Sequence, residues 1–314
     1  MTRRAAIALA VLVAWLTGST LGSHVGLPSA AARTPAIVMG RAHGGYTPAL
    51  TGRRTITILA VGSDARGGPV LRGRSDSIHV IFLQPRTRRA VIVGIPRDSW
   101  VSIPSHGTDK INAAMASGGP TRLVATIERN FGARIDYWAV TSFNAFARMV
   151  DRIGGLTVRV PFRMQDSFSG SNFQAGRQRL RGRRALAFAR DRKSVPGGDF
   201  GRQENGGRVL EGALVQFQRE YRRDPSRLLT WVAVGARDID TDIPIAELVE
   251  LAFTASRVRA ARVRNLVLPG ASGSAGGLSV VRLSMGWSRA IFRDAMRDGA
   301  LHRANIPPSP TGAR

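Results

Sequence analysis

Three short runs of apolar, largely β-branched residues lie close together between Thr55 and Asp98. The runs are Ile56–Val61, Ile78–Leu83 and Val91–Ile95, and each is bounded by Gly, Pro, Ser or Asp. Runs of this length and composition are typical of β-strands. The link between the second and third runs is too short for a crossover helix, so we expect these two strands to form an antiparallel hairpin.

Charged residues stand at the ends of these runs. Asp64 follows the first, Asp76 precedes the second and Arg97 follows the third. If the strands run up, down and up, all three residues fall on one edge of the sheet. Two carboxylates and a guanidinium at one edge suit a divalent metal ion and a phosphate group. The alternative is that the aspartates only cap turns, but the nearby Arg66 and Arg74 favour the phosphate site.

Helix and strand patterns alternate along the rest of the chain. Apolar residues at helical spacing predict helices at Thr121–Phe131, Ala145–Ile153, Arg181–Arg190, Asp199 to about Arg223, Ile245–Val258 and Trp287–Asp298. Short apolar runs predict further strands at Tyr137–Phe143, Leu156–Val160, Val263–Leu268 and Val280–Leu283. Such alternation predicts an α/β fold in which helices cover a sheet, and we expect residues 55–303 to form one domain.

The chain is strongly basic, with 46 Lys and Arg residues against 21 Asp and Glu, which gives a net charge of +25. This charge favours anionic partners, among them nucleic acid, anionic lipid, phosphate-bearing polymers and diphosphate substrates. The chain has no cysteine, which excludes disulfides and cysteine-based metal sites. The five histidines are scattered without metal-ligand spacing, and His79, inside a predicted strand, is expected to be structural.

The N-terminus narrows the choice of partner. Arg3 and Arg4 precede the apolar run Ala5–Leu16, and no charged residue follows until Arg33. A basic start followed by an apolar run is typical of an export signal. Residues 1–28 are therefore expected to be a cleaved signal peptide or an uncleaved signal anchor in the cell membrane. In either case the folded part lies outside the cytoplasm, which makes nucleic acid an unexpected partner.

Two further regions are expected to flank the domain. Residues 29–54 are rich in Ala, Gly, Pro and Thr without periodicity, which predicts a flexible linker. Residues 304–314 are rich in Pro, which predicts a disordered tail.

A second basic cluster lies where one predicted helix ends and the next begins. Arg190 and Arg192 follow the apolar segment Ala185–Ala189, and Asp199 and Arg202 begin the next helix. Arginine suits bidentate recognition of phosphate, and the start of a helix favours anions. This cluster therefore predicts a second part of the phosphate site. The arginines from 177 to 184 are instead expected on a solvated face.

Several short motifs occur in a fixed order along the chain. They are Gly62-Ser63-Asp64-Ala65-Arg66, Arg74-Ser75-Asp76-Ser77-Ile78, Ile95-Pro96-Arg97-Asp98, Lys110-Ile111-Asn112-Ala113-Ala114, Val150-Asp151-Arg152-Ile153-Gly154-Gly155, Arg190-Asp191-Arg192 and Asp199-Phe200-Gly201-Arg202. Together they resemble the LytR–CpsA–Psr family from about Thr55 to Arg223, and more weakly to Leu301.

The resemblance implies a membrane-anchored enzyme outside the cytoplasm, with a mixed β-sheet between helices. Such enzymes move a glycopolymer from a polyprenyl-diphosphate carrier onto peptidoglycan and form a phosphodiester. Phosphoryl transfer depends on positioning and charge neutralisation more than on a protein nucleophile. That requirement fits this sequence, in which no nucleophile motif or P-loop is found.

The resemblance also implies roles for the site residues. Asp64 and Asp76 would hold Mg²⁺, or alternatively Mn²⁺, against the diphosphate, and Asp199 would orient an arginine or act as a base. The basic residues that would bind the diphosphate are Arg66, Arg74, Arg97, Lys110, Arg190, Arg192 and Arg202. The polyprenyl chain would lie in an apolar tunnel behind them.

One departure from the family pattern concerns the helix that begins at Asp199. Asn205 and Gly206 stand where the family usually has Arg-Gln, and each glycine at 206 and 207 is expected to weaken the helix by roughly 1 kcal/mol. Two other functions therefore stay open. One is hydrolysis of a polyprenyl diphosphate, and the other is non-catalytic binding of a prenyl lipid or an anionic wall polymer.

Overall fold

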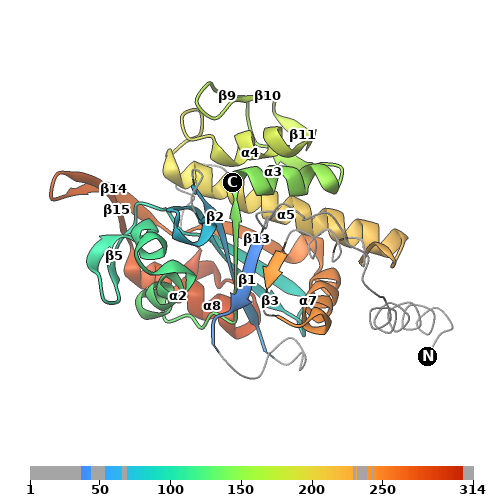
Figure 1. The fold of residues 1–314 in the computed structure, drawn as a ribbon, viewed down its shortest axis with the longest axis horizontal. Coiled ribbons are helices and arrows are strands. Elements are labelled where there is room, and N and C mark those ends of the chain that lie inside the picture. Colours follow the sequence, from blue (N-terminus) through green and yellow to red (C-terminus); the bar gives the residue numbers. More distant parts are fainter. Residues whose placement is uncertain are drawn as a thin grey trace, which may run out of the picture. The chain divides into compact units, whose positions relative to one another are not determined.

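A seven-stranded mixed sheet forms the centre of the part of the chain that the computed structural model describes, residues 37–43, 54–65, 69–228, 231, 239–241 and 243–306. Its strand order is β12-β1-β7-β2-β3-β4-β13 (Figure 1). The strands are β1 Ile37–Arg41, β2 Ile56–Ser63, β3 Ser75–Gln84, β4 Arg89–Gly94, β7 Tyr137–Ser142, β12 Ile239–Thr241 and β13 Val263–Val267.

The strand directions place the ends of β2, β3 and β4 as the sequence predicted. β3 pairs antiparallel with both β2 and β4, so the three strands run up, down and up. β7 and β13 pair in parallel with β2 and β4 on either side. The predicted α/β fold with a mixed sheet is confirmed.

Alternating side chains along the central strands give the sheet two apolar faces. On β3, Val80 and Phe82 point into one cluster and Ile81 and Leu83 into the other. The first cluster is closed by α2 (Ile111–Phe131) and α8 (Met285–Asp298). The second is closed by α5 (Asp199–Arg223) and α7 (Ile245–Arg257). Because strand side chains alternate between faces, this pattern produces helix, sheet and helix layers (Figure 1).

A further layer packs on α5 at the end of the sheet where β2 ends. It contains α3 (Phe143–Arg152), α4 (Gly182–Arg190), and two small antiparallel sheets. The sheets pair β8 (Leu156–Val160) with β11 (Gly176–Leu180), and β9 (Met164–Asp166) with β10 (Ser171–Phe173). Phe188, Val158 and Val209 join these elements in one buried cluster. We call this part of the protein the α3–α4 layer.

The remaining elements are short. They are the strand pair β5 (Trp100–Ile103) and β6 (Gly107–Lys110), the pair β14 (Gly270–Ala275) and β15 (Leu278–Leu283), and the 3₁₀ helices η3 (Val70–Arg72), η4 (Ala260–Arg262) and η5 (Arg303–Asn305). Helix α2 is interrupted at Gly118 and Gly119, and the latter adopts a left-handed φ of 68°. Its second half therefore starts at Pro120, one residue before the predicted helix Thr121–Phe131.

Two boundary predictions are wrong in part. Residues 37–41, inside the predicted linker, form β1 and pair with both β7 and β12. In the predicted tail, Asn305 belongs to η5 and donates a hydrogen bond to the Asp294 carboxylate at 2.7 Å. Both segments are too short to show periodicity. β1 is ordered by strands far along the chain, and Asn305 contacts a residue of the preceding helix.

The predicted signal segment, residues 1–28, and residues 307–314 lie outside the described residues. Among the helices that are described, none has the length and apolar character needed to cross a membrane.

The core between β3, α2 and α8 provides a test of this layering. The ring of Phe292 lies 5.4 Å from that of Phe82 and 5.0 Å from that of Phe131, so it joins all three elements. We expect Phe292→Ala to lower the free energy of unfolding by about 3–5 kcal/mol, measured by urea denaturation. Arg293→Ala, at the exposed neighbouring position, should change it by less than about 0.5 kcal/mol. Similar losses in both variants would contradict the assigned core.

Candidate active site

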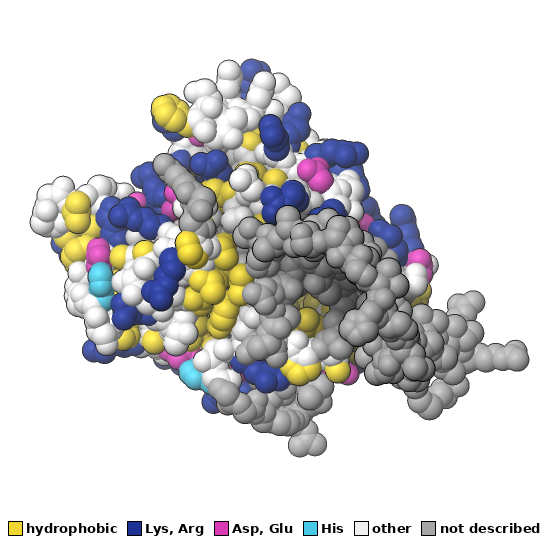
Figure 2. All heavy atoms as spheres, viewed as in Figure 1, with side chains coloured by type: hydrophobic (Ala, Val, Ile, Leu, Met, Phe, Trp, Pro, Cys, Tyr) yellow, Lys and Arg dark blue, Asp and Glu magenta, His cyan; other side chains and the backbone are white. Residues whose placement is uncertain are grey.

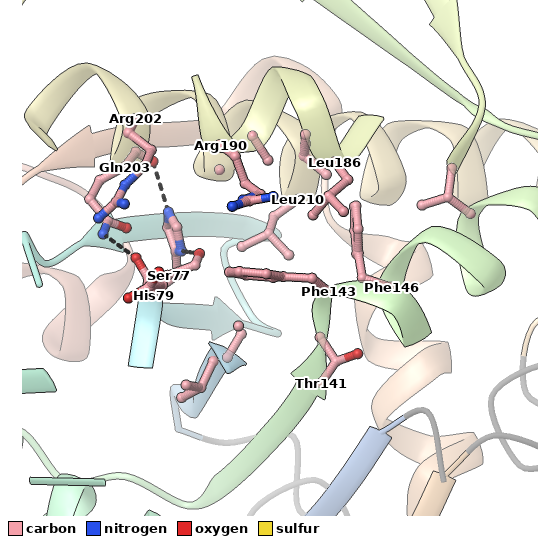
Figure 3. Close-up of a pocket in the computed structure, with 18 of the residues that line it drawn as sticks. Ser77, His79, Thr141, Phe143, Phe146, Leu186, Arg190, Arg202, Gln203 and Leu210 are labelled. Atoms are coloured by element: carbon pink, nitrogen blue, oxygen red, sulfur yellow. Dashed lines mark hydrogen bonds between the residues drawn. The ribbon is translucent and has the colours of Figure 1, made fainter. Parts of the chain in front are cut away.

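A cavity of about 550 Å³ lies between the end of the central sheet and the α3–α4 layer. Most of its wall is apolar and comes from α3, α4, α5 and β8 (Figure 3). This part of the wall includes Phe143, Phe146, Met149, Val150, Leu156, Leu186, Val209 and Leu210. One end of the cavity is instead lined by charged side chains.

The charged end brings together most of the residues that the sequence singled out. Those that line it are Asp64, Asp76, Arg97, Arg190, Arg192 and Arg202. They come from the ends of β2, β3 and β4, from the end of α4 and the segment that follows it, and from the first turn of α5. Both predicted clusters therefore belong to one site.

A β-bulge explains how neighbouring residues of β3 both reach the cavity. Gly62 pairs with Ser77, but Ser63 pairs with Ser75, so Asp76 is an extra residue on its strand. Adjacent strand residues ordinarily point to opposite faces, and a bulge re-aims one of them. Asp76 and Ser77 consequently both line the cavity.

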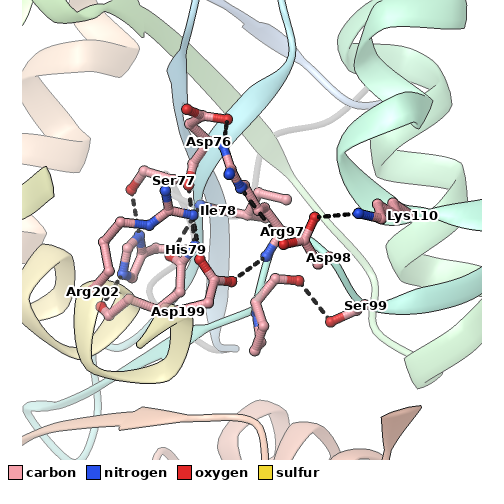
Figure 4. A network of polar contacts seen from close by, with 12 residues as sticks. Asp76, Ser77, Ile78, His79, Arg97, Asp98, Ser99, Lys110, Asp199 and Arg202 are labelled. Atoms are coloured by element: carbon pink, nitrogen blue, oxygen red, sulfur yellow. Dashed lines mark hydrogen bonds and ion pairs between the residues drawn. The ribbon is translucent and has the colours of Figure 1, made fainter. Parts of the chain in front are cut away.

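Arg97 is held by carboxylates on two sides. Its Nη1 donates to Asp76 Oδ1 at 2.7 Å, and its Nε lies 3.8 Å from Asp98 Oδ2 (Figure 4). Burial lowers the pKa of Arg97, but Asp76, Asp98 and Asp199 outweigh it, and the pKa rises above its ordinary value. The guanidinium is therefore a permanent, oriented positive charge.

Asp199 connects the start of α5 to the end of β4. Its Oδ2 accepts a hydrogen bond from the backbone N–H of Arg97 at 3.0 Å, and its Oδ1 pairs with Arg202. Burial raises the pKa of Asp199, and Arg202 opposes that effect. Its carboxylate does not belong to the cavity wall, and it positions two residues that do.

Two buried guanidinium N–H groups at this end have no hydrogen-bond acceptor among the described residues. They are the Nε groups of Arg97 and Arg202. Buried donors in proteins are almost always paired. Among the described residues, these two donors instead stay unsatisfied, in the wall beside the charged end of the cavity.

Arg190 and Arg192 reach the same end from the other side. The Arg190 guanidinium lies over the Phe143 ring, 4.9 Å from its centroid (Figure 3). Both side chains are exposed. They are placed to meet an anion that approaches from solvent.

Three of the predicted phosphate ligands need separate mention. Arg66 lies outside the described residues. Arg74 has an exposed side chain, and Lys110 pairs with Asp98 at 3.1 Å, so neither belongs to the cavity wall. A phosphate-binding role for these three stays a prediction.

Sequence reasoning did not find a polar chain that starts at Ser77. His79 Nε2 lies 2.8 Å from the backbone carbonyl of Gln203, so this nitrogen carries the proton. His79 Nδ1 is then the acceptor for the Ser77 hydroxyl, 3.2 Å away. The Gln203 side chain also donates to the Asp76 carbonyl at 3.2 Å. His79 is buried and acts structurally, as expected, but it also orients a cavity hydroxyl.

The unusual glycine of α5 faces this histidine. A Cβ at Gly206 would lie 2.6 Å from His79 Cε1, so the imidazole occupies the space that a larger residue would need. Asn205, the other departure, accepts a hydrogen bond from Arg208 at 3.0 Å. Neither change leaves a gap in this part of the site.

Two carboxylates at the charged end have the donor atoms that a divalent metal ion would need. The described residues contain no group of three or more His, Cys, Asp or Glu side chains placed to hold a metal ion. Asp64 and Asp76 nevertheless line the same cavity. Mg²⁺ is commonly bound by one or two carboxylates together with substrate phosphates and water. The donor set therefore fits an Mg²⁺ ion that binds together with a diphosphate.

Comparisons with known proteins agree with this geometry. The sequence model of the LytR_cpsA_psr family matches residues 36–289. The chain is 37% identical over 159 residues to a Bacillus subtilis polyisoprenyl-teichoic acid–peptidoglycan teichoic acid transferase, TagU. That match covers 50% of this chain and 51% of the relative. The chain therefore matches about half the length of such curated relatives.

Solved structures share the fold. The crystal structure of B. subtilis TagV is 25% identical and has a TM-score of 0.67, with 78% of this chain and 98% of TagV covered. A LytR-CPS2A-psr family protein, YwtF (TagT), with bound octaprenyl pyrophosphate lipid has a TM-score of 0.61 at 20% identity. That comparison covers 87% of this chain and 99% of the other.

Burial of His79 predicts a pH dependence of stability. Burial lowers the pKa of His79 to about 4, and its contact with the Gln203 carbonyl opposes this. As the pH falls below about 6.5, His79 binds a proton in the unfolded chain. In the folded protein His79 stays neutral until about pH 4. Stability is thus lost over this window, by about 3 kcal/mol.

We expect His79→Gln to lose less stability than the unchanged protein between pH 7 and pH 4.5, measured by urea denaturation. His106→Gln, at an exposed turn, should show the same loss as the unchanged protein. An identical pH profile for both variants would show that His79 contributes nothing to acid sensitivity.

Proposed function

Because the chain belongs to the LytR_cpsA_psr family, we propose that it transfers a glycopolymer from a polyprenyl-diphosphate carrier to peptidoglycan, forming a phosphodiester link. It would act outside the cytoplasm, attached to the membrane through the predicted N-terminal signal segment. The relative TagU carries the name of a transferase of this kind.

The observation that carries the proposal is the division of one cavity into an arginine-lined end and an apolar body. A prenyl diphosphate has the same division, with an anionic head on a long hydrocarbon chain. The guanidinium groups of Arg97, Arg190, Arg192 and Arg202 line that end and would provide cationic donors for the head. YwtF (TagT), which has the same fold, was solved with octaprenyl pyrophosphate bound.

In the proposed reaction, a peptidoglycan hydroxyl attacks the phosphorus that bears the glycopolymer. The bond from that phosphorus to the bridging oxygen breaks, and prenyl phosphate leaves. Arg97, Arg190, Arg192 and Arg202 would hold the phosphates and offset the charge that builds on their oxygens. Asp64 and Asp76 would hold Mg²⁺, which when bound adds further neutralisation. Asp199 would keep Arg97 and Arg202 in position.

A labelled lipid-linked donor, mixed with the full chain and peptidoglycan, tests the proposal. Label that becomes bound to peptidoglycan supports transfer. Label released into solution would instead indicate hydrolysis of the diphosphate. Binding of the donor with neither product would indicate a non-catalytic lipid-binding protein.

The arginines make distinct predictions for donor binding. Arg190→Ala or Arg192→Ala should remove a charge-assisted hydrogen bond worth roughly 1.5–3 kcal/mol, which weakens lipid-diphosphate binding about tenfold to a hundredfold. Arg183→Ala changes an exposed residue of α4 that does not line the cavity, and should have almost no effect. Affinities are compared at one salt concentration. Equal losses at Arg183 and Arg192 would indicate diffuse charge attraction and no defined site.

The two carboxylates predict the dependence on metal. Asp64→Asn or Asp76→Asn should abolish Mg²⁺-dependent transfer, because an amide oxygen lacks the charge of the carboxylate ligand. The amide oxygen of Asn at position 76 can still accept a hydrogen bond from Arg97. The free energy of unfolding, measured by urea denaturation, should therefore stay close to that of the unchanged protein. Asp109→Asn, on β6, is the matched control. Full activity of either site variant after chelation of divalent metals would contradict this assignment.

A further inference from the structure

The α3–α4 layer carries a strongly one-sided surface charge. Residues 160–198 contain nine cationic side chains, all exposed, whereas their two carboxylates, Asp166 and Asp191, are both buried. The cations are Arg163, Arg177, Arg179, Arg181, Arg183, Arg184, Arg190, Arg192 and Lys193. None of them forms an ion pair with a carboxylate in the described part of the chain. Figure 2 shows Lys and Arg side chains spread over this part of the molecule.

An aromatic ring projects from this charged surface. Phe168, in the turn between β9 and β10, is 78% exposed, more than any other large hydrophobic residue that the structure describes. The Lys193 ammonium lies over its ring, 3.4 Å from the centroid. The guanidinium of Arg184, on α4, lies 5.1 Å from the centroid of the Phe173 ring on β10. An apolar ring beside long cationic side chains is suited to a water–membrane interface.

The turn that presents Phe168 is fixed by a buried carboxylate. Asp166 Oδ1 accepts a hydrogen bond from the Phe168 N–H at 2.9 Å. Burial raises the pKa of Asp166, but the Ser169 hydroxyl and the N–H groups of Phe168, Arg192 and Lys193 outweigh it and lower the pKa. Asp166 thus holds the turn that carries Phe168 against the segment that carries Arg192 and Lys193. The exposed position of the ring is therefore fixed by the structure.

This surface continues into the cavity, because Phe168 and Lys193 also belong to the cavity wall. We propose that Phe168, Arg163, Arg184 and Lys193 form a docking surface for an anionic lipid bilayer. The proposal rests on the proposed function, in which the substrate is a lipid whose apolar chain keeps it in a membrane. Docking here brings the charged end of the cavity to the level of the lipid headgroups.

Charge and apolarity together favour a bilayer over a soluble polymer as the partner. Basic side chains near a membrane surface are attracted to anionic lipids, and an aromatic ring gains by entering the headgroup region. A hydrated phosphate-bearing polymer would use the cations but leave the ring exposed to water. The observations therefore favour the membrane.

The absence of cysteine makes a direct test simple. Phe168→Cys provides a single labelling site in the full chain for an environment-sensitive fluorophore. The labelled protein is mixed with phosphatidylcholine vesicles, with or without phosphatidylglycerol, that contain a spin-labelled quencher lipid. Leu278→Cys, 51% exposed on the β14–β15 hairpin, is the matched control, and this hairpin projects from another side of the molecule (Figure 1).

We expect strong quenching at position 168 with anionic vesicles, weaker quenching with neutral vesicles, and little at position 278. Attachment of the chain through any other segment affects both labels alike, so the difference between them reports local contact. Equal quenching at the two positions, or none at 168, would overturn the docking surface. A response at 168 to soluble polyphosphate but not to vesicles would replace the membrane with a polymer.

Charge removal gives a second readout. In the protein labelled at position 168, Arg163→Gln and Lys193→Gln should each weaken binding to anionic vesicles about fivefold. Arg86→Gln and Arg88→Gln, in the β3–β4 turn at the other end of the sheet, should leave the quenching unchanged. If the Arg86 and Arg88 variants weakened vesicle binding as much as the Arg163 and Lys193 variants, the proposal would be contradicted. The vesicles contain no prenyl lipid, so loss of transfer with intact docking would overturn only the proposed function.

Discussion

The carboxylate of Asp199 is the contact on which the site depends, because it joins the start of α5 to the sheet edge at the charged end of the cavity. It accepts the backbone N–H of Arg97 at the end of β4 and pairs with Arg202 on α5. Both contacts are buried, where a lost partner leaves a polar group unsatisfied at a cost of about 1–3 kcal/mol. The start of α5 is thereby fixed against the sheet edge, and arginines from opposite layers converge on one small volume.

That convergence gathers positive charge at one end of the cavity. The carboxylates of Asp76 and Asp98 each contact Arg97, yet its Nε, like that of Arg202, has no hydrogen-bond acceptor in the described part of the chain. Arg190 and Arg192 add two more exposed charges at the same end. Bringing like charges together is unfavourable unless an anion offsets them. An anion bound at this end of the cavity would offset this charge.

The sequence predicted this site in outline because its members stand beside strong local signals. Asp64, Asp76 and Arg97 each adjoin a β-branched run, and the up-down-up order of those runs was enough to place them on one edge. The chain from Ser77 through His79 to Gln203 was not predictable, because it depends on a bulge and on contact with a helix more than a hundred residues away. β1 was missed for the same reason, since its partners β7 and β12 lie far along the chain.

The glycines of α5 show what a local helix rule leaves out. Considered alone, Gly206 and Gly207 weaken a helix through their conformational freedom. In the fold, a Cβ at Gly207 would lie 1.9 Å from Asn265 Oδ1, and one at Gly206 would meet His79. The missing side chains therefore let α5 approach β3 and β13 closely enough for Asn265 to donate to the Glu204 carbonyl at 2.9 Å. The same approach brings the Gln203 carbonyl within reach of His79 and so orients the Ser77 hydroxyl in the cavity. The change from the usual family residues is thus part of how this chain packs its cavity wall.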